Sequence, residues 1–290
     1  MNAQADAARH LLNNSGVLKK SELTAGQRKA LEELMQQTRF IEIVKQGRST
    51  FYRVTNKTAL ENYLARQQPL TEAELPIDIP NRSRNVGLHG DSKKGKSTHD
   101  AYYLLMKAWD IGVIWSNGKA QLDVAALTRQ FGLAALQVGV NQSWQCNKPL
   151  LLIENQALFD RCDWLDNGFD GCLIYYAGQL PDMLLQWLAE RPRSSQVILF
   201  PDYDGVGLSN YVRLLESIHP ETQLDFYWMP GWQEKLQAHG KPKVWANTHT
   251  LFENACHKLQ AIGAMDENFQ QLARLSQRAG KALEQEAVWL

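Results

Sequence analysis

Cysteines, long apolar runs and net charge are scarce or absent in this 290-residue sequence, and each absence argues against a class of protein. Its four cysteines lie far apart and form no Cys-x-x-Cys pair, which argues against a disulfide framework and a zinc knuckle. No apolar run approaches the roughly 18 residues of a membrane span. The first residues lack the charged-then-apolar order of a signal peptide. We therefore expect a cytoplasmic protein of one or two domains.

The basic and acidic residues balance over the whole chain but not along it. Residues 1–70 carry 11 Lys and Arg against 6 Asp and Glu, residues 71–148 carry 9 against 7, and residues 149–290 carry 11 against 18. A basic N-terminal part joined to an acidic C-terminal part suggests a module that binds a polyanion beside a domain that collects carboxylates.

Residues 1–68 show the element order of a winged-helix domain. Apolar spacing predicts helices, and alternation of apolar and polar residues predicts a β-hairpin. The predicted helices cover 5–14, 21–37 and 58–66, and the hairpin strands cover 40–46 and 49–54. Thr24 is able to start the second helix.

The winged-helix prediction leaves two uses open. In one, the helix over 26–37 enters a groove of DNA while basic side chains contact phosphates. Those side chains are Arg28, Lys29, Arg48 and Arg53. In the other, the domain docks onto a protein. We favour the contact with DNA because the positive charge of the chain gathers here.

Residues 69–148 are expected to form a linker and a middle region that contacts DNA. The segment 67–83 holds three prolines with little periodicity, which is typical of a linker. Beyond it we expect a helix over 99–110, a hairpin over 112–123 that turns at Asn117–Gly118, and a helix over 124–132.

The octapeptide GDSKKGKS at 90–97 matches the phosphate loop of a P-loop ATPase, in which Lys96 would reach phosphates and Ser97 would bind Mg²⁺. That motif follows a strand, but the apolar piece over 86–88 is very short, and no apolar strand ending in Asp comes next. We favour the alternative that basic residues of this region contact the DNA backbone without reading its sequence. They are Arg82, Arg84, Lys93, Lys94 and Lys96.

From residue 149 onward, short apolar strands alternate with helices, which predicts an α/β fold. The predicted strands cover 150–154, 172–178, 196–204 and 224–230. Because these strands are apolar on both sides, we expect a Rossmann-like parallel sheet with helices on both faces. Residues 149–290 would form one catalytic domain that ends in helices over 247–287.

Two of these strands end in acidic residues. Glu154 follows the first strand, and Asp202 and Asp204 follow the third. Ligands of open parallel sheets bind beyond the carboxyl ends of the strands, and three carboxylates there would repel one another unless they share a divalent cation. Mg²⁺ suits such a set, and Gly205 and Gly207 would let a phosphate approach the backbone.

The order of these residues resembles the Toprim domain of topoisomerases, primases and related nucleases. In that family an apolar strand ends in Glu, a glycine follows the second strand, and Asp-x-Asp follows the third. Here they are Glu154, Gly178, Asp202 and Asp204. The LLLIEN and DYDGVGL runs, with HGDSK at 89–93 and ALEQEAV at 282–288, are similar to a narrower group. It comprises the Toprim subunit of bacterial Wadjet and MukBEF-like plasmid-defence systems (JetD, also called MksG) and, distantly, the topoisomerase VI A subunit.

This resemblance implies an endonuclease that hydrolyses double-stranded plasmid or foreign DNA with Mg²⁺ or Mn²⁺. It implies a homodimer that works with an SMC-type ATPase complex. It also favours a place for Glu286 over the metal, although a solvated helix face explains Glu286 equally well.

Three other functions stay open. Tyr102 or Tyr103 would be the nucleophile of a topoisomerase-like transesterase, but both lie in a predicted helix where aromatic residues usually pack. A P-loop ATPase would use Lys96. A protein with an inactive Toprim domain would bind DNA as an assembly subunit. The leading hypothesis is the metal-dependent endonuclease with Glu154, Asp202 and Asp204 as its catalytic residues.

Overall fold

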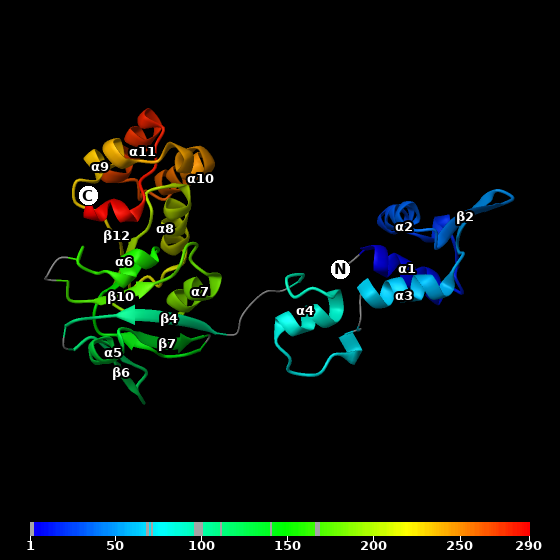
Figure 1. Ribbon diagram of the computed structural model, residues 1–290, viewed down its shortest axis with the longest axis horizontal. Coiled ribbons are helices and arrows are strands. Elements are labelled where there is room, and N and C mark those ends of the chain that lie inside the picture. The colour runs from blue at the N-terminus through cyan, green and yellow to red at the C-terminus, as the bar shows by residue number, and fades with distance from the viewer. Residues whose placement is uncertain are drawn as a thin grey trace. The chain divides into compact units, whose positions relative to one another are not determined.

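The computed structural model describes residues 3–67, 70, 72–95, 101–110, 112–139, 141–165 and 169–290 (Figure 1). The chain divides into two compact units, Met1–His99 and Asp100–Leu290. Both units mix helices with strands, so the fold class is mixed α/β. Within the described ranges no helix combines the length and the apolar character that a membrane crossing requires.

The N-terminal unit contains a three-stranded antiparallel sheet in the order β1-β3-β2. Its elements are α1 (Ala3–Asn13), β1 (Val17–Lys19), η1 (Lys20–Glu22), α2 (Ala25–Gln37), β2 (Ile41–Gln46), β3 (Ser49–Val54) and α3 (Lys57–Gln67). The predicted hairpin and helices are present. α2 begins at Ala25 rather than residue 21 because the Thr24 hydroxyl accepts a hydrogen bond from the backbone N–H of Gln27.

The segment predicted to be a linker contains regular structure. It includes η2 (Glu72–Glu74) and α4 (Asn81–His89). The prediction of a strand over 86–88 is therefore wrong, because these residues form the last turn of α4. Pro80 precedes the first turn, and Gly90 ends the helix in the left-handed conformation, with φ of 65°.

The C-terminal unit is built on a six-stranded sheet in the order β12-β11-β9-β10-β4-β7. Its strands are β4 (Tyr102–Lys107), β7 (Ala134–Val138), β9 (Leu150–Ile153), β10 (Cys172–Tyr175), β11 (Gln196–Phe200) and β12 (Gln223–Phe226). The four strands from β9 to β12 are parallel as predicted, but β4 runs antiparallel to both of its neighbours. The prediction of a wholly parallel sheet is therefore wrong.

β4 also replaces the helix predicted over 99–110, so far as that segment is described. Leu104 and Met106 are buried while Tyr103 is exposed, which is the alternation of a strand. An unbroken run of apolar residues does not distinguish a strand from a helix, and here the pairing with β10 and β7 decides.

A small antiparallel sheet in the order β6-β5-β8 confirms the hairpin at Asn117–Gly118. It consists of β5 (Ile114–Ser116), β6 (Gln121–Asp123) and β8 (Gln145–Cys146). The predicted helix follows as α5 (Val124–Phe131), capped by Asp123 and ended by Gly132. The region expected over 69–148 is thus divided: its part up to residue 99 belongs to the N-terminal unit and the rest to the C-terminal unit.

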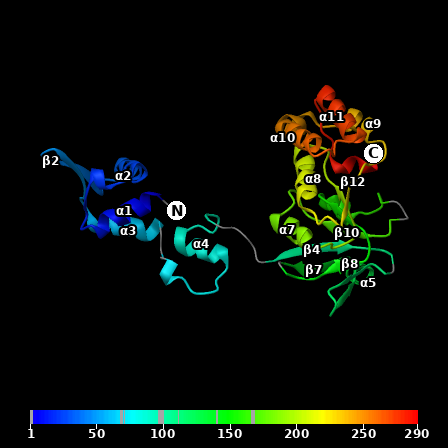
Figure 2. The same ribbon diagram turned by 180° about the vertical axis from the view of Figure 1, so that it is seen from behind.

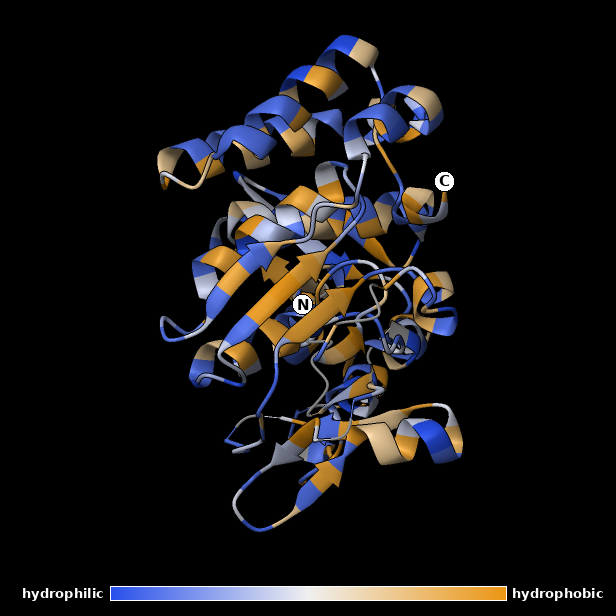
Figure 3. Ribbon diagram, turned by 90° about the vertical axis from the view of Figure 1, so that its left-hand side faces the viewer, coloured by the Kyte–Doolittle hydropathy of each residue, from blue (hydrophilic) through white to orange (hydrophobic). Residues whose placement is uncertain are grey.

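Helices cover the large sheet on both faces. They are α6 (Gln156–Asp160), α7 (Asp182–Glu190), α8 (Gly205–Ser217), α9 (Trp232–His239), α10 (Pro242–Ala261) and α11 (Glu267–Ala279), followed by η3 (Gln285–Trp289). α7 and α8 pack against each other, and α10 packs on α8, as Figures 1 and 2 show. In the sheet, β10 lies on one side of β9, whereas the connections from β10 to β11 and from β11 to β12 run toward the other side. Because crossovers between parallel strands are right-handed, α6 is expected on the face of the sheet opposite to α7 and α8. Figure 3 shows the apolar central strands between these layers.

Candidate active site

The two acid-bearing strand ends are neighbours in the sheet. β9 and β11 pair in parallel with Ile153 opposite Phe200, and Glu154 follows the first strand while Asp202 follows the second. From there the chain turns to α6 on one face and to α8 on the other. Ligands of open α/β sheets bind at such a switch point. We call the ends of β9 and β11, with Glu154, Asp202 and Asp204, the crevice.

The carboxylates at this crevice are difficult to ionise. Burial, followed by the charge of Asp204, raises the pKa of Glu154 to about 7. Burial, followed by the charge of Glu154, raises the pKa of Asp202 to about 8. Burial also raises the pKa of Asp204, which is only 6% exposed. The acids therefore repel one another in a poorly solvated place, which is typical of functional sites.

Each acid is held by a specific contact. The buried hydroxyl of Tyr176 donates to Glu154 Oε2 at 3.2 Å. Asp204 caps α8 by accepting from the backbone N–H of Gly207 at 2.8 Å. Between the two aspartates, the buried side chain of Tyr203 accepts from the N–H of Met229 at 2.7 Å.

Gln285, which the sequence analysis missed, connects the two strand ends. Its side chain is fully buried, its Oε1 accepts from the N–H of Asn155 at 2.9 Å, and its Nε2 donates to the carbonyl oxygen of Phe200. Its backbone N–H donates to Asp202 Oδ1 at 2.8 Å. A backbone pairing between Tyr203 and Leu283 brings this segment to the crevice. The sequence offered one signal, the ALEQEAV run, but we drew only Glu286 from it.

Glu286 lies at the same crevice, on the 3₁₀ helix η3 rather than on an α-helix. It is exposed, it accepts a hydrogen bond from Asn155 Nδ2, and its charge contributes to the raised pKa values of Glu154 and Asp202. All four predicted acids therefore lie near the ends of β9 and β11, although no three of them are close enough to share one ion.

The three glycines that the sequence analysis singled out, Gly178, Gly205 and Gly207, occupy positions where a larger residue would be strained or would clash. A Cβ added to Gly205 would lie 2.1 Å from the carbonyl oxygen of Thr248 on α10, and one added to Gly207 would lie 1.9 Å from that of Asp202. Both glycines thus permit close packing of backbone around the acids. Gly178 follows β10 with φ of 79° and open space beside it.

The carboxylate oxygens of these acids are suitable ligands for a hard cation, although too few of them lie close together to surround one. Among the residues that the structure describes, no three His, Cys, Asp or Glu side chains are close enough to hold one ion. Mg²⁺ usually takes one or two protein carboxylates and completes its shell with water and phosphate oxygens. Glu154 and Asp202, with Asp204 and Glu286 beside them, offer such oxygens.

The chain was compared with known protein families once its fold was established. The model of a domain of unknown function, DUF7281, matches residues 113–289. The chain belongs to this family. A comparison with curated proteins gave no match. The DUF7281 segment begins at β5 and contains the whole carboxylate crevice, whereas the N-terminal unit and β4 precede it.

The two tyrosines considered as nucleophiles lie just before the DUF7281 segment, on β4. Tyr102 is half-buried and burial raises its pKa, while Tyr103 is 63% exposed. Because β4 is antiparallel, Tyr102 lies at the sheet edge where the acids lie, two strands from Glu154. Two strand spacings amount to about 10 Å.

The basic residues predicted to contact DNA also precede the DUF7281 segment. Arg53 pairs with Glu42 at 2.6 Å, Arg84 pairs with Glu72 at 2.5 Å, and Lys29 lies 4.0 Å from Glu33. Arg28 is half-buried, Arg82 donates to the Ser92 hydroxyl at 3.4 Å, and three residues are exposed: Arg48, Lys93 and Lys94. Lys96 and Ser97 lie outside the described residues, and the strand that a phosphate loop would follow is replaced by α4.

Proposed function

We propose that this protein is a metal-dependent DNA endonuclease. The observation that carries the proposal is the pair Glu154 and Asp202, which follow adjacent parallel strands at the switch point. Beside burial, the charge of Glu154 raises the pKa of Asp202, and the charges of Asp204 and Glu286 raise the pKa of Glu154. A pair of repelling, desolvated carboxylates destabilises a fold, so a bound cation is the simplest reason for it to be there.

Glu154 and Asp202 would bind Mg²⁺ or Mn²⁺ directly, and Asp204 and Glu286 on η3 would act through the water molecules of the ion, because no three of these acids are close enough to share it. When bound, the metal supplies Lewis acidity toward a phosphate and an activated water. The chain itself orients the carboxylates: Tyr176 holds Glu154, and the N–H of Gln285 holds Asp202. The N-terminus of α8 at Asp204 adds a positive dipole end that favours an approaching phosphate.

The finer fold assignments are part of the proposal. Four parallel strands with acids after β9 and β11 support a Toprim domain, and the hairpin strands that pair in the order β1-β3-β2 after α1 and α2 support a winged helix. The basic residues of the N-terminal unit would hold duplex DNA against the acidic unit. Action as a homodimer with an SMC-type ATPase complex in plasmid defence is supported by the sequence resemblance.

The proposal is tested by incubating the full chain with supercoiled plasmid and Mg²⁺, Mn²⁺ or EDTA. We expect metal-dependent nicked or linear DNA, and a loss of about 100-fold or more in Asp202→Asn and Glu154→Gln, with DNA binding retained. Glu221→Gln is the control, because Glu221 is exposed before β12 at the opposite end of the sheet. Equal cleavage by Asp202→Asn and the wild type would overturn the metal site.

The same gels examine a second candidate, which the position of Tyr102 at the acid edge favours. A tyrosine transesterase would leave products that enter the gel only after protease treatment, and Tyr102→Phe would abolish them. DNA binding without cleavage, even with the ATPase complex added, would identify a non-catalytic subunit.

A further inference from the structure

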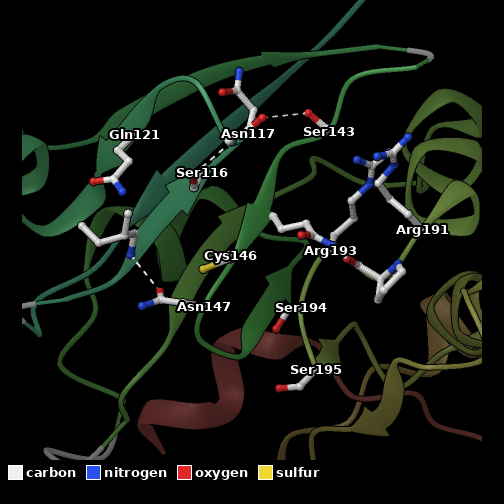
Figure 4. A pocket seen from close by; sticks show the side chains of 14 residues that line it. Ser116, Asn117, Gln121, Ser143, Cys146, Asn147, Arg191, Arg193, Ser194 and Ser195 are labelled. Atoms are coloured by element: carbon white, nitrogen blue, oxygen red, sulfur yellow. Dashed lines mark hydrogen bonds between the residues drawn. The ribbon is translucent and has the colours of Figure 1, made fainter.

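A large cavity lies in the C-terminal unit away from the carboxylates. Its volume is about 840 Å³, and it is lined by the β5–β6 hairpin, by β8 and by the loop between α7 and β11 (Figure 4). The loop residues Ser194 and Ser195 come directly before β11, whereas Asp202 follows its end. Five residues of strand separate the two places by about 17 Å, so this cavity is not part of the crevice.

Amide and hydroxyl side chains predominate in the lining of this cavity. No Asp, Glu or Lys is found among its lining residues in the part of the chain that the structure describes. Figure 4 shows Arg191 and Arg193 across the cavity from Ser116, Asn117 and Gln121. A cavity without carboxylates does not suit a metal ion, and one with so many amides does not suit a lipid.

The guanidinium of Arg193 binds other groups of the protein and is not free to bind a ligand. It is buried, donates to the carbonyl oxygens of Trp187 and Gln142 at 2.7 and 2.6 Å, and pairs with Glu190 at 3.1 Å. Burial, followed by the charge of Arg191, lowers the pKa of Arg193 to about 10. The positive charges of Arg191 and Arg193 thus repel each other, and Glu190 neutralises that of Arg193.

Arg191 lacks the partners that Arg193 has. Its Nε is buried and meets no hydrogen-bond acceptor among the described residues. A buried donor without an acceptor costs free energy, and a guanidinium is suited to paired hydrogen bonds with a phosphate or carboxylate. Arg191 also lines the cavity, so the rest of its guanidinium is suited to an anion there.

We propose that this cavity binds a nucleotide 5′-phosphate, with the phosphate on Arg191 and the base among the amide side chains. Asn117 already uses its Oδ1 for the N–H groups of Lys119 and Ala120, so its Nδ2 is left to donate. Gln145 donates its Nε2 to the carbonyl oxygen of Pro192, so its Oε1 is left to accept. Such donor and acceptor groups match the edges of nucleobases.

The volume also fits this class of ligand. Sites for small organic ligands span about 300 to 1,000 Å³, so the cavity has room for a base and a sugar as well as the phosphate. A free nucleotide and the phosphorylated end of a DNA strand share this chemistry, and the experiment separates them.

The test is calorimetric titration of the full chain in EDTA, which removes any contribution of the proposed metal site. The ligands are AMP, GMP, CMP and UMP, the nucleoside that corresponds to each, inorganic phosphate, and a hexadeoxynucleotide with and without a 5′-phosphate. We expect at least one phosphorylated nucleotide or oligonucleotide to bind, and its form without phosphate to bind about tenfold or more weakly. Binding of a mononucleotide identifies a free nucleotide, and binding of only the phosphorylated oligonucleotide identifies a strand end.

Two variants and a control decide where the ligand binds. Arg191→Gln should weaken binding about tenfold or more, and Ser195→Trp should block the cavity without disturbing the fold, because Ser195 is exposed. Arg129→Gln, at an exposed position of α5, should bind as the wild type does. Unchanged affinity in both cavity variants, no binding by any probe, or inorganic phosphate binding as tightly as the nucleotides would overturn the proposal. None of these outcomes bears on cleavage at the crevice.

Discussion

The ionised carboxylates of Glu154 and Asp202 destabilise the folded chain, whereas their protonated forms do not, so this effect on stability depends on pH. Glu154 and Asp202 have pKa values of about 7 and about 8 in the folded chain, against about 4 for unfolded carboxyl groups. The folded state therefore binds their protons more tightly. The associated stability is complete below about pH 4 and is lost as the pH rises through the folded values.

We expect the melting temperature in EDTA to fall between pH 6 and pH 8, and Asp202→Asn to reduce that fall. At pH 8 the variant should melt above the wild type, because it removes a buried charge and keeps an oxygen for the N–H of Gln285. Thermal denaturation followed by circular dichroism measures this. A variant that melts below the wild type at pH 8 would contradict it.

Gln285 has the opposite effect, because it satisfies buried backbone groups of two strand ends. Gln285→Leu leaves the N–H of Asn155 and the carbonyl oxygen of Phe200 without that partner. We expect the free energy of unfolding to fall by about 2 kcal/mol or more. Urea denaturation measures it, and Gln237→Leu, at an exposed position of α9, should change stability by only about 0.5 kcal/mol or less.

At the scale of elements, features that depend on neighbouring residues could be predicted from the sequence, whereas those that depend on distant contacts could not. Thr24 and Asp123 begin helices where a capping residue is expected, and Asn117–Gly118 turns a hairpin. The β4 strand was missed because its pairing with β10 and β7 lies in distant sequence. Glu154, Asp202 and Asp204 could be predicted from strand ends. The ALEQEAV run indicated the segment of Gln285 but not its role, because a buried amide leaves no periodic signal.

The junction of β11 and α8 depends on Gly207. We expect Gly207→Ala to destabilise the chain by about 2 kcal/mol or more, because its Cβ would overlap the carbonyl oxygen of Asp202 and force the loop to move. Plasmid cleavage should fall with it. Gly26→Ala provides the contrast: Gly26 lies in α2 with no heavy atom near its added Cβ, so that change should be neutral or stabilising in urea denaturation.

At the scale of the whole molecule, the charge gradient supports the proposal that the N-terminal part binds DNA and the C-terminal part cleaves it. Arg48 and Lys93 are exposed cations in the basic part. If each contacts a phosphate, its change to alanine should weaken duplex binding and reduce the slope of log affinity against log salt by about 1. Fluorescence anisotropy over a salt series measures this. Asp202→Asn should leave the slope unchanged, and a slope that no basic substitution alters would contradict the assignment.

The bond between Asn155 and Gln285 also sets an order of events during protein synthesis. The two residues are 130 positions apart, so the ends of β9 and β11 emerge from the ribosome long before the residue that joins them. A chain released early, by a stop codon or a stalled ribosome before residue 285, would carry every acid of the strand ends without that connection. The network around the acids is therefore complete only in a chain that contains Gln285.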